Sequence, residues 1–218
     1  MKEDRSRVPD PSGSVSAEGR NLQPHLAGFV LLDELNCRAC HERAGSRDGD
    51  VYGVSPRQAP RLDEVGSRVD PEYLIRFIMD PGSTEPGTSM PHMLNQISPE
   101  ARRPVAEEIT HFLVSLDSPL FTRETREMDH AKRGEALFHE VGCVACHAPR
   151  SSDGKEMVVS PSVSLGGLQE KYSIQSLTRF LEDPLQVRPD GRMPNMKLDH
   201  FEAEDLAHYL AGSLDLIT

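Results

Sequence analysis

Apolar residues recur three or four positions apart along much of this chain, the spacing that places them on one face of a helix. The clearest cases are two segments at residues 105–116 and 203–214, where Ile109-Thr-His-Phe-Leu resembles Leu206-Ala-His-Tyr-Leu. No segment keeps the sustained alternation of apolar and polar residues that is typical of strands. The pattern therefore predicts an all-α fold.

The helical pattern belongs to a repeat that covers most of the chain. Each copy has a helical segment with a glycine, a Cys-x-x-Cys-His sequence, a middle helix ending at Asp-Pro, a Met-Pro-x-Met loop and a closing helix. The markers of the first copy are Gly28, Cys37, Asp80 and Met90, and those of the second are Gly134, Cys143, Asp183 and Met193. Proline lacks an N–H donor and restricts the residue before it, so it should end each middle helix.

The repeat predicts two domains of similar length. We expect a disordered polar tail at residues 1–20, a first domain at 21–118 and a second at 119–218. An insertion near residues 94–103 separates the methionine loop from the closing helix of the first copy.

The composition is poor in the large side chains that fill a core, since aromatic residues make up 5% and Trp is absent. A bound planar macrocycle would supply the missing apolar surface. The formal net charge of -11 disfavours nucleic acid as a partner and favours redox partner proteins with basic docking faces. No apolar run is long enough to span a membrane.

All four cysteines lie in two Cys-x-x-Cys-His sequences, formed by Cys37, Cys40 and His41, and by Cys143, Cys146 and His147. This is the spacing of c-type haem attachment, in which both sulfurs bond to the porphyrin vinyl groups and the histidine becomes the proximal iron ligand. A thioredoxin-like redox pair, a four-cysteine zinc site or two disulfides could also use Cys-x-x-Cys. None of these requires a histidine directly after the second cysteine. We therefore predict two covalently attached haem c groups.

An iron held by one histidine has a sixth position, and its occupant separates electron carriers from enzymes. Met90 and Met193 are the candidates, because each precedes proline at the corresponding place in its copy. His/Met ligation favours a comparatively high reduction potential. Met93 and Met196 recur three residues later and are interpreted as packing residues, whereas His92 competes only in the first copy.

A proximal histidine also needs a partner for its other ring nitrogen, usually a backbone carbonyl. Pro60 and Pro161 lie between the cysteine sequence and the middle helix of each copy, and we expect them to supply it. Loop arginines that could pair with haem propionates, or remain solvated, are Arg57, Arg61, Arg188 and Arg192.

The order of these features resembles class I cytochrome c domains, and two in tandem resemble the soluble dihaem cytochromes c. Leu31-Leu-Asp-Glu-Leu-Asn-Cys and Gly191-Arg-Met-Pro-Asn-Met are also similar to cytochrome domains of large multidomain planctomycete proteins. The resemblance covers nearly all of the chain after residue 20. It implies a few helices wrapped round each haem. The ligand pairs it implies are His41 with Met90 and His147 with Met193.

These features predict an electron carrier rather than an enzyme. One alternative is a dihaem peroxidase-like oxidoreductase with one iron open to substrate, and another is the haem module of a larger multidomain enzyme. Haem is attached to such cytochromes outside the cytoplasmic membrane, so we expect a periplasmic or otherwise extracytoplasmic location. No signal-peptide pattern follows Met1, and we expect the chain to be a mature form or a segment of a longer precursor.

Overall fold

The computed structural model describes residues 23–35, 37, 59–116, 119–150, 156–157, 162–189 and 191–211. Within these ranges the chain forms helices and isolated bridges, and no strand occurs. The prediction of helices without strands is confirmed for this part of the chain. Several predicted features lie outside the described residues, namely the tail at 1–20, Cys40, His41, Arg57 and Pro161.

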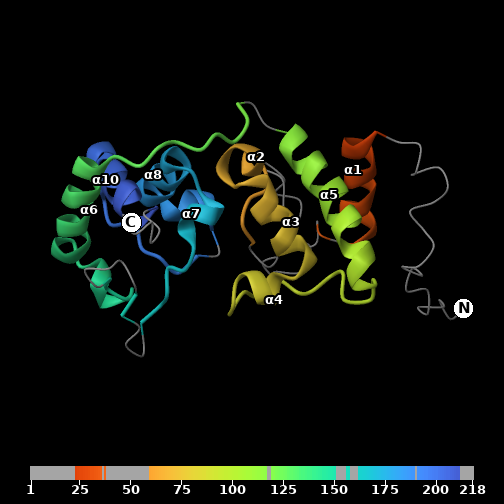
Figure 1. Ribbon diagram of the computed structural model, residues 1–218, viewed down its shortest axis with the longest axis horizontal. Helices are drawn as coiled ribbons and strands as arrows, with labels where there is room; N and C mark the ends of the chain where they lie inside the picture. The colour runs from red at the N-terminus through yellow and green to blue at the C-terminus, as the bar shows by residue number, and fades with distance from the viewer. Residues whose placement is uncertain are drawn as a thin grey trace, which may run out of the picture.

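The helices fall into two groups that follow the same order along the chain. The N-terminal group contains α1 (Pro24–Glu34), α2 (Val65–Arg68), α3 (Pro71–Met79), α4 (Pro81–Thr84) and α5 (Pro99–Ser115). The C-terminal group contains α6 (Met128–Glu140), the 3₁₀ turn η3 (Cys143–Ala145), α7 (Leu168–Lys171), α8 (Ile174–Glu182), α9 (Pro184–Val187) and α10 (His200–Leu210). Figure 1 shows the two groups side by side, with an extended segment leading into α6.

The middle helices α3 and α8 begin and end for the same chemical reasons. Asp70 and Ser173 cap their N-termini by accepting hydrogen bonds from backbone N–H groups of the first turn. Each helix ends at the predicted Asp-Pro sequence, at Asp80 and Asp183. The proline then opens a further short helix, α4 or α9, because its fixed φ and missing N–H suit the first helical position.

The first and last helices of each group cross at a glycine. A Cβ atom on Gly28 of α1 would lie 2.0 Å from the carbonyl oxygen of Glu108 on α5. A Cβ atom on Gly134 of α6 would likewise lie 2.0 Å from the carbonyl oxygen of Asp205 on α10. Glu108 and Asp205 hold corresponding places in the repeat. The two helix pairs therefore pack through corresponding residues, and at each crossing a side chain larger than glycine would collide with backbone.

Both closing helices begin earlier than the expected residues 105 and 203. In α5 the insertion near residues 94–103 supplies Ser98 at the N-cap and a proline at the first helical position, which lengthens the helix. In α10 the side chains of Asp199 and Glu202 form a capping box around the first turn. The second closing helix ends at Leu210, four residues before the expected residue 214.

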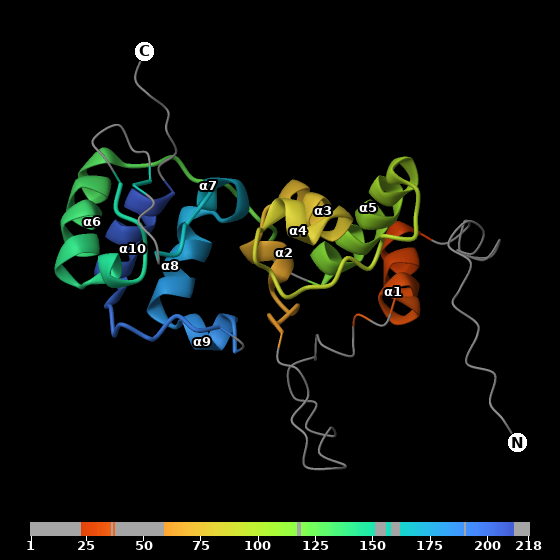
Figure 2. The same cartoon turned by 90° about the horizontal axis from the view of Figure 1, so that it is seen from below.

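The two groups also touch through corresponding residues. Val69, which follows α2, forms an isolated antiparallel bridge with Tyr172, which follows α7. The N–H of Asp70 donates to the carbonyl of Lys171 at 2.9 Å. Figure 2 shows α2 facing α7 and α8 across this contact. Buried residues of both groups belong to one continuous hydrophobic cluster.

Candidate haem sites

The second Cys-x-x-Cys-His sequence follows directly on α6 as one tight turn. Gly142 has a φ of 92°, a left-handed conformation that glycine adopts without strain, and it breaks the helix. The 3₁₀ turn η3 then runs from Cys143, whose carbonyl accepts hydrogen bonds from the N–H groups of Cys146 at 3.2 Å and His147 at 2.9 Å. The turn brings both cysteines and the histidine to the end of α6.

One nitrogen of the His147 ring has a backbone partner. Nδ1 lies 3.2 Å from the carbonyl oxygen of Val163, and the two residues form a parallel bridge. The N–H of Val163 in turn donates to the carbonyl of Cys146 at 2.8 Å. A proton on Nδ1 donated to this carbonyl leaves Nε2 as the nitrogen with a lone pair for a metal.

Pro161, the residue predicted to supply the carbonyl at His147, lies outside the described residues. The carbonyl that the structure places at Nδ1 belongs to Val163, two residues further on. The proline is a visible signal for a fixed loop, but it does not tell which carbonyl of that loop points at the ring. Backbone direction over two residues is set by the bridge, which the sequence does not display.

Met193 lies in a segment without helix that leads from α9 to α10. It is half-buried and packs against the hydrophobic cluster, as do Cys143 and Val144 of the η3 turn. Met193 corresponds to Met90 of the N-terminal group. Met93, three residues after Met90, is 36% exposed.

A cavity of about 620 Å³ opens in the N-terminal group. Cys37, Pro60 and Met90 all line it, so three of the predicted site residues of the first copy share one space. Apolar side chains form much of the remaining wall; among them are Leu32, Val65, Leu74, Phe77 and Leu113. Cavities of this size and apolar character are those in which proteins bury a small organic molecule or cofactor.

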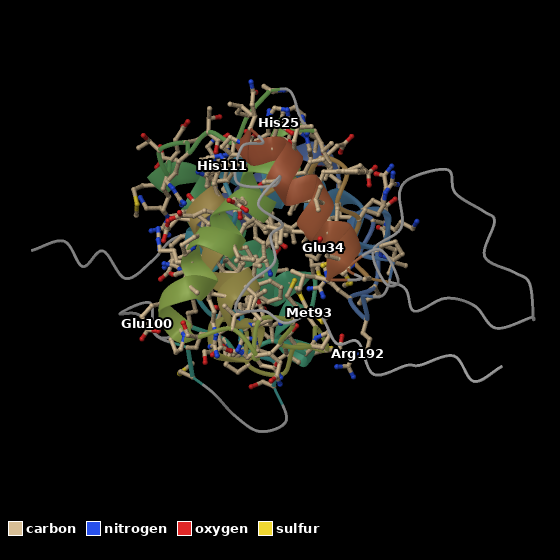
Figure 3. All side chains as sticks on the ribbon, turned by 90° about the vertical axis from the view of Figure 1, so that its right-hand side faces the viewer. His25, Glu34, Met93, Glu100, His111 and Arg192 are labelled. Atoms are coloured by element: carbon tan, nitrogen blue, oxygen red, sulfur yellow. The ribbon has the colours of Figure 1, made fainter. Side chains whose placement is uncertain are left out.

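Figure 3 looks onto α1 and α5 from the N-terminal end of the molecule. Glu34 marks the C-terminal end of α1, and Met93 lies beneath it, on the side of the group that carries the methionine loop. Met93 lines the same cavity as Met90. Its interpretation as a packing residue is compatible with that place.

Residues 131–213 match the family model for cytochrome c. This part of the chain is similar to cytochrome c domains. The match begins within α6 and continues beyond α10, so it includes Cys143, Cys146, His147 and Met193. The cytochrome c domain indicates haem-based electron transfer, with covalently bound haem c.

A curated relative is cytochrome c oxidase subunit 2 of Bacillus subtilis (strain 168), which is 29% identical over 100 residues. The aligned region covers 41% of this chain and 28% of that relative. No solved structure matches the chain. In the part of the chain that the structure describes, no helix is long and apolar enough to cross a membrane. Those same residues hold no cluster of three or more His, Cys, Asp or Glu side chains arranged to bind a metal ion.

The residues of the cytochrome c domain fit the cofactor that the family uses. Burial raises the pKa of the Cys143 thiol, the reverse of the lowered pKa that activates a thioredoxin-like cysteine. The His147 ring is oriented by a backbone carbonyl in the way that metal-binding histidines usually are. Cys143 and Cys146 would form the thioether bonds to haem, and His147 would hold the iron.

The cavity in the N-terminal group also fits such a cofactor, because apolar walls meet a cysteine and a methionine there. Its polar lining includes Arg68, Tyr73 and Glu85 of the N-terminal group and Lys171 and Arg188 of the C-terminal group. Arg188 thus lines a cavity of the other group, which its place in the second copy did not predict. Arg61 also lines the cavity, where its guanidinium pairs with Asp63.

Proposed function

We propose that this chain is an electron carrier with two haem c groups, one in each helix group. The observation that supports a haem in the N-terminal group is its cavity, which Cys37 and Met90 both line. In the repeat these two residues correspond to Cys143 and Met193 of the cytochrome c domain. Cys37, Cys40 and His41 would attach the additional haem.

We assign the sixth iron position to a methionine in each group, Met90 or Met193. Haem c, when bound, supplies a one-electron couple between ferric and ferrous iron. Met90 and Met193 would each supply a neutral thioether to the iron, a ligand that favours the ferrous state and would leave no open coordination position for a substrate. This ligation supports a carrier over a dihaem peroxidase-like oxidoreductase. The apolar walls of the cavity in the N-terminal group would keep water from the iron held there.

The carrier would work outside the cytoplasm, where haem c attachment takes place. Its formal charge of -11 would attract redox partners with basic docking faces and speed their encounter. Raising the salt concentration should therefore slow electron exchange with such a partner. Stopped-flow rates at several ionic strengths measure this effect.

A second candidate is a haem module of a larger oxidase-like enzyme. The observation that favours it is the likeness to cytochrome c oxidase subunit 2 of Bacillus subtilis, of which the chain covers 28%. In that case the chain would pass electrons to a catalytic unit elsewhere. The full coding sequence of the gene, and the proteins that co-purify with its native product, separate the module from a carrier that acts alone.

The number of haems is tested by the mass of the purified protein and by the alkaline pyridine spectrum, which counts haem c per chain. Two haems per chain support the proposal, and one haem per chain contradicts it. Replacing Cys37 and Cys40 together with alanine should remove one haem and leave the spectrum of the other. Optical spectra with a sulfur-to-iron band for both haems and no high-spin signal support His/Met ligation.

The methionine ligands are tested by redox titration of Met90→Ala and Met193→Ala. Each variant should lower the reduction potential of one haem and produce a high-spin signal or a new ligand there. Met93→Ala and Met196→Ala are matched controls, because they remove a methionine three residues away in the same loop. Unchanged potentials in both ligand variants would refute the assignment.

A further inference from the structure

The contact between the helix groups lies against the cavity of the N-terminal group. Lys171 is the last residue of α7, and Tyr172, which follows it, forms the bridge to Val69; Arg188 follows α9. All three line the cavity that holds Cys37 and Met90. A part of that wall therefore belongs to the other helix group.

Lys171 is tied to the N-terminal group by charge and by ring contacts. Its ammonium lies 2.9 Å from a carboxylate oxygen of Glu85, and its side chain is 17% exposed. The ammonium also lies over the rings of Tyr73, at 5.2 Å, and of Tyr172, at 5.4 Å. The hydroxyl of Tyr73 donates to the same Glu85 oxygen at 2.5 Å.

The contact holds a fixed set of charges. Burial alone would raise the pKa of Glu85, but the charge of Lys171 and the hydrogen bonds from Tyr73 and Lys171 outweigh it and lower that pKa. Burial and the hydrogen bond to Glu85 raise the pKa of Tyr73. At neutral pH the contact therefore carries a carboxylate at Glu85, a neutral phenol at Tyr73 and the two cations Lys171 and Arg188.

We propose that the C-terminal group completes the first haem site and that Lys171 and Arg188 set the reduction potential of that haem from across the contact. This inference rests on the proposed function, because it needs a haem in the cavity of the N-terminal group. Lys171, Tyr172 and Arg188 line this cavity from the other helix group, and Lys171 and Arg188 are the basic residues among them.

The physical reason is the charge difference between the two oxidation states. Ferric iron carries one more positive charge than ferrous iron, so a fixed cation nearby disfavours the ferric state and raises the potential. A fixed anion such as Glu85 has the opposite effect. The charges lie beside an apolar cavity, where Coulomb interactions are screened less than at an exposed surface.

The experiment is a spectroelectrochemical titration of the intact haem-loaded protein and its variants. Lys171→Met and Arg188→Gln each remove a cation, and Glu85→Gln removes the anion. Lys132→Met is the matched control, because Lys132 is 72% exposed on α6 beside Asp129. The haem whose potential moves in Met90→Ala is assigned to the N-terminal group.

We expect Lys171→Met and Arg188→Gln to lower the potential of that haem, and Glu85→Gln to raise it. The ferrous-to-ferric ratio at a fixed applied potential should change severalfold to about tenfold, the latter being equivalent to about 59 mV for a one-electron couple. Lys132→Met should leave the ratio unchanged.

Two results would overturn the inference while the proposed function stands. One is a protein with two haems in which all three variants leave the Met90-sensitive potential unmoved. The other is a shift of the potential in the same direction in Lys171→Met and Glu85→Gln. Loss of a cation and loss of an anion must shift the potential in opposite directions, whereas a loosened contact would shift it in the same direction in both variants. A protein with a single haem per chain would instead overturn the proposed function, and this inference with it.

Discussion

At both helix crossings, α1 with α5 and α6 with α10, the two backbones approach closely at a glycine. The crossings differ in the side chains around that glycine. In the N-terminal group the rings of Phe29 and Phe112 lie 5.4 Å apart beside Gly28. Burial raises the pKa of Glu108 there, and the nearby charge of His111 offsets only part of this effect.

In the C-terminal group the crossing is held by polar contacts. Asp205 corresponds to Glu108, and it accepts two hydrogen bonds of 2.7 Å from the guanidinium of Arg133. His208 is buried and accepts a hydrogen bond of 3.0 Å from the N–H of Glu127 at the start of α6. The corresponding His111 is exposed. The close approach of the helices is therefore the feature common to both crossings, whereas the charges around it differ.

The largest effect is expected from adding a methyl group at either crossing. In an ordinary helix Gly→Ala is stabilising by about 1 kcal/mol. Gly28→Ala and Gly134→Ala should instead destabilise the protein by about 3 kcal/mol, because each Cβ would overlap a carbonyl oxygen of the facing helix. Guanidinium denaturation of the haem-loaded protein measures the change.

Gly82→Ala is the control for both, since its Cβ would meet only the Asp80 carboxylate at 3.8 Å. If Gly134→Ala were destabilising and Gly28→Ala stabilising, the two crossings would not be equivalent and the comparison would fail.

A smaller effect is expected from the corresponding acids. Burial raises the pKa of Asp205, but the hydrogen bonds from Arg133 and His130 and their charges outweigh it, so the folded-state pKa is lowered from 3.8. The carboxylate thus stabilises the fold above the unfolded pKa, and this contribution is lost as the pH falls through the folded pKa. Asp205→Asn should cost about 1 kcal/mol at pH 7.

Glu108→Gln should have the opposite sign. Burial raises the pKa of Glu108 in the folded state, so its ionised form opposes folding at neutral pH. The substitution should leave stability unchanged or increase it slightly, as urea unfolding at pH 7 would show. Equal losses in Asp205→Asn and Glu108→Gln would mean that the two acids have the same role after all.

The smallest effect is expected on acidification below neutral pH. Burial lowers the pKa of His208 from 6.5, and protonation of Nδ1 would remove the acceptor for the Glu127 N–H. His208 therefore binds a proton more readily in the unfolded chain than in the folded one, and the stability of the fold falls as the pH drops below 6.5. Denaturation midpoints between about pH 7.5 and 5.5 measure the slope.

His208→Asn should flatten this slope. His111→Asn, at the exposed corresponding position, should keep the slope of the parent protein. A slope that persists in His208→Asn would place the titrating group elsewhere.

Much of the fold could be read from the sequence because its signals are local. Asp80-Pro81 and Asp183-Pro184 end the middle helices through the geometry of proline itself, and the glycines of α1 and α6 recur at the crossings. The apolar pattern predicts the starts of α5 and α10 too late, because capping residues outside that pattern extend α5 by six residues and α10 by three.

The candidate sites were less visible because they depend on contacts between distant segments. The Val163 carbonyl meets His147 only through a bridge across a loop. Lys171 and Arg188 reach the cavity of the N-terminal group only after the groups have packed. No periodicity within either copy of the repeat carries information about a contact between the copies.

The bridge between Val69 and Tyr172 joins two residues that hold the same place in the repeat. In an isologous dimer such a contact between corresponding residues occurs at the two-fold axis, where both partners must present the same side chain. A single chain is free of that rule, since each side of the contact is encoded separately. The position held by Glu85 in one half is held by Arg188 in the other. Covalent fusion thus permits an asymmetry of opposite charges that two identical subunits could never acquire by substitution.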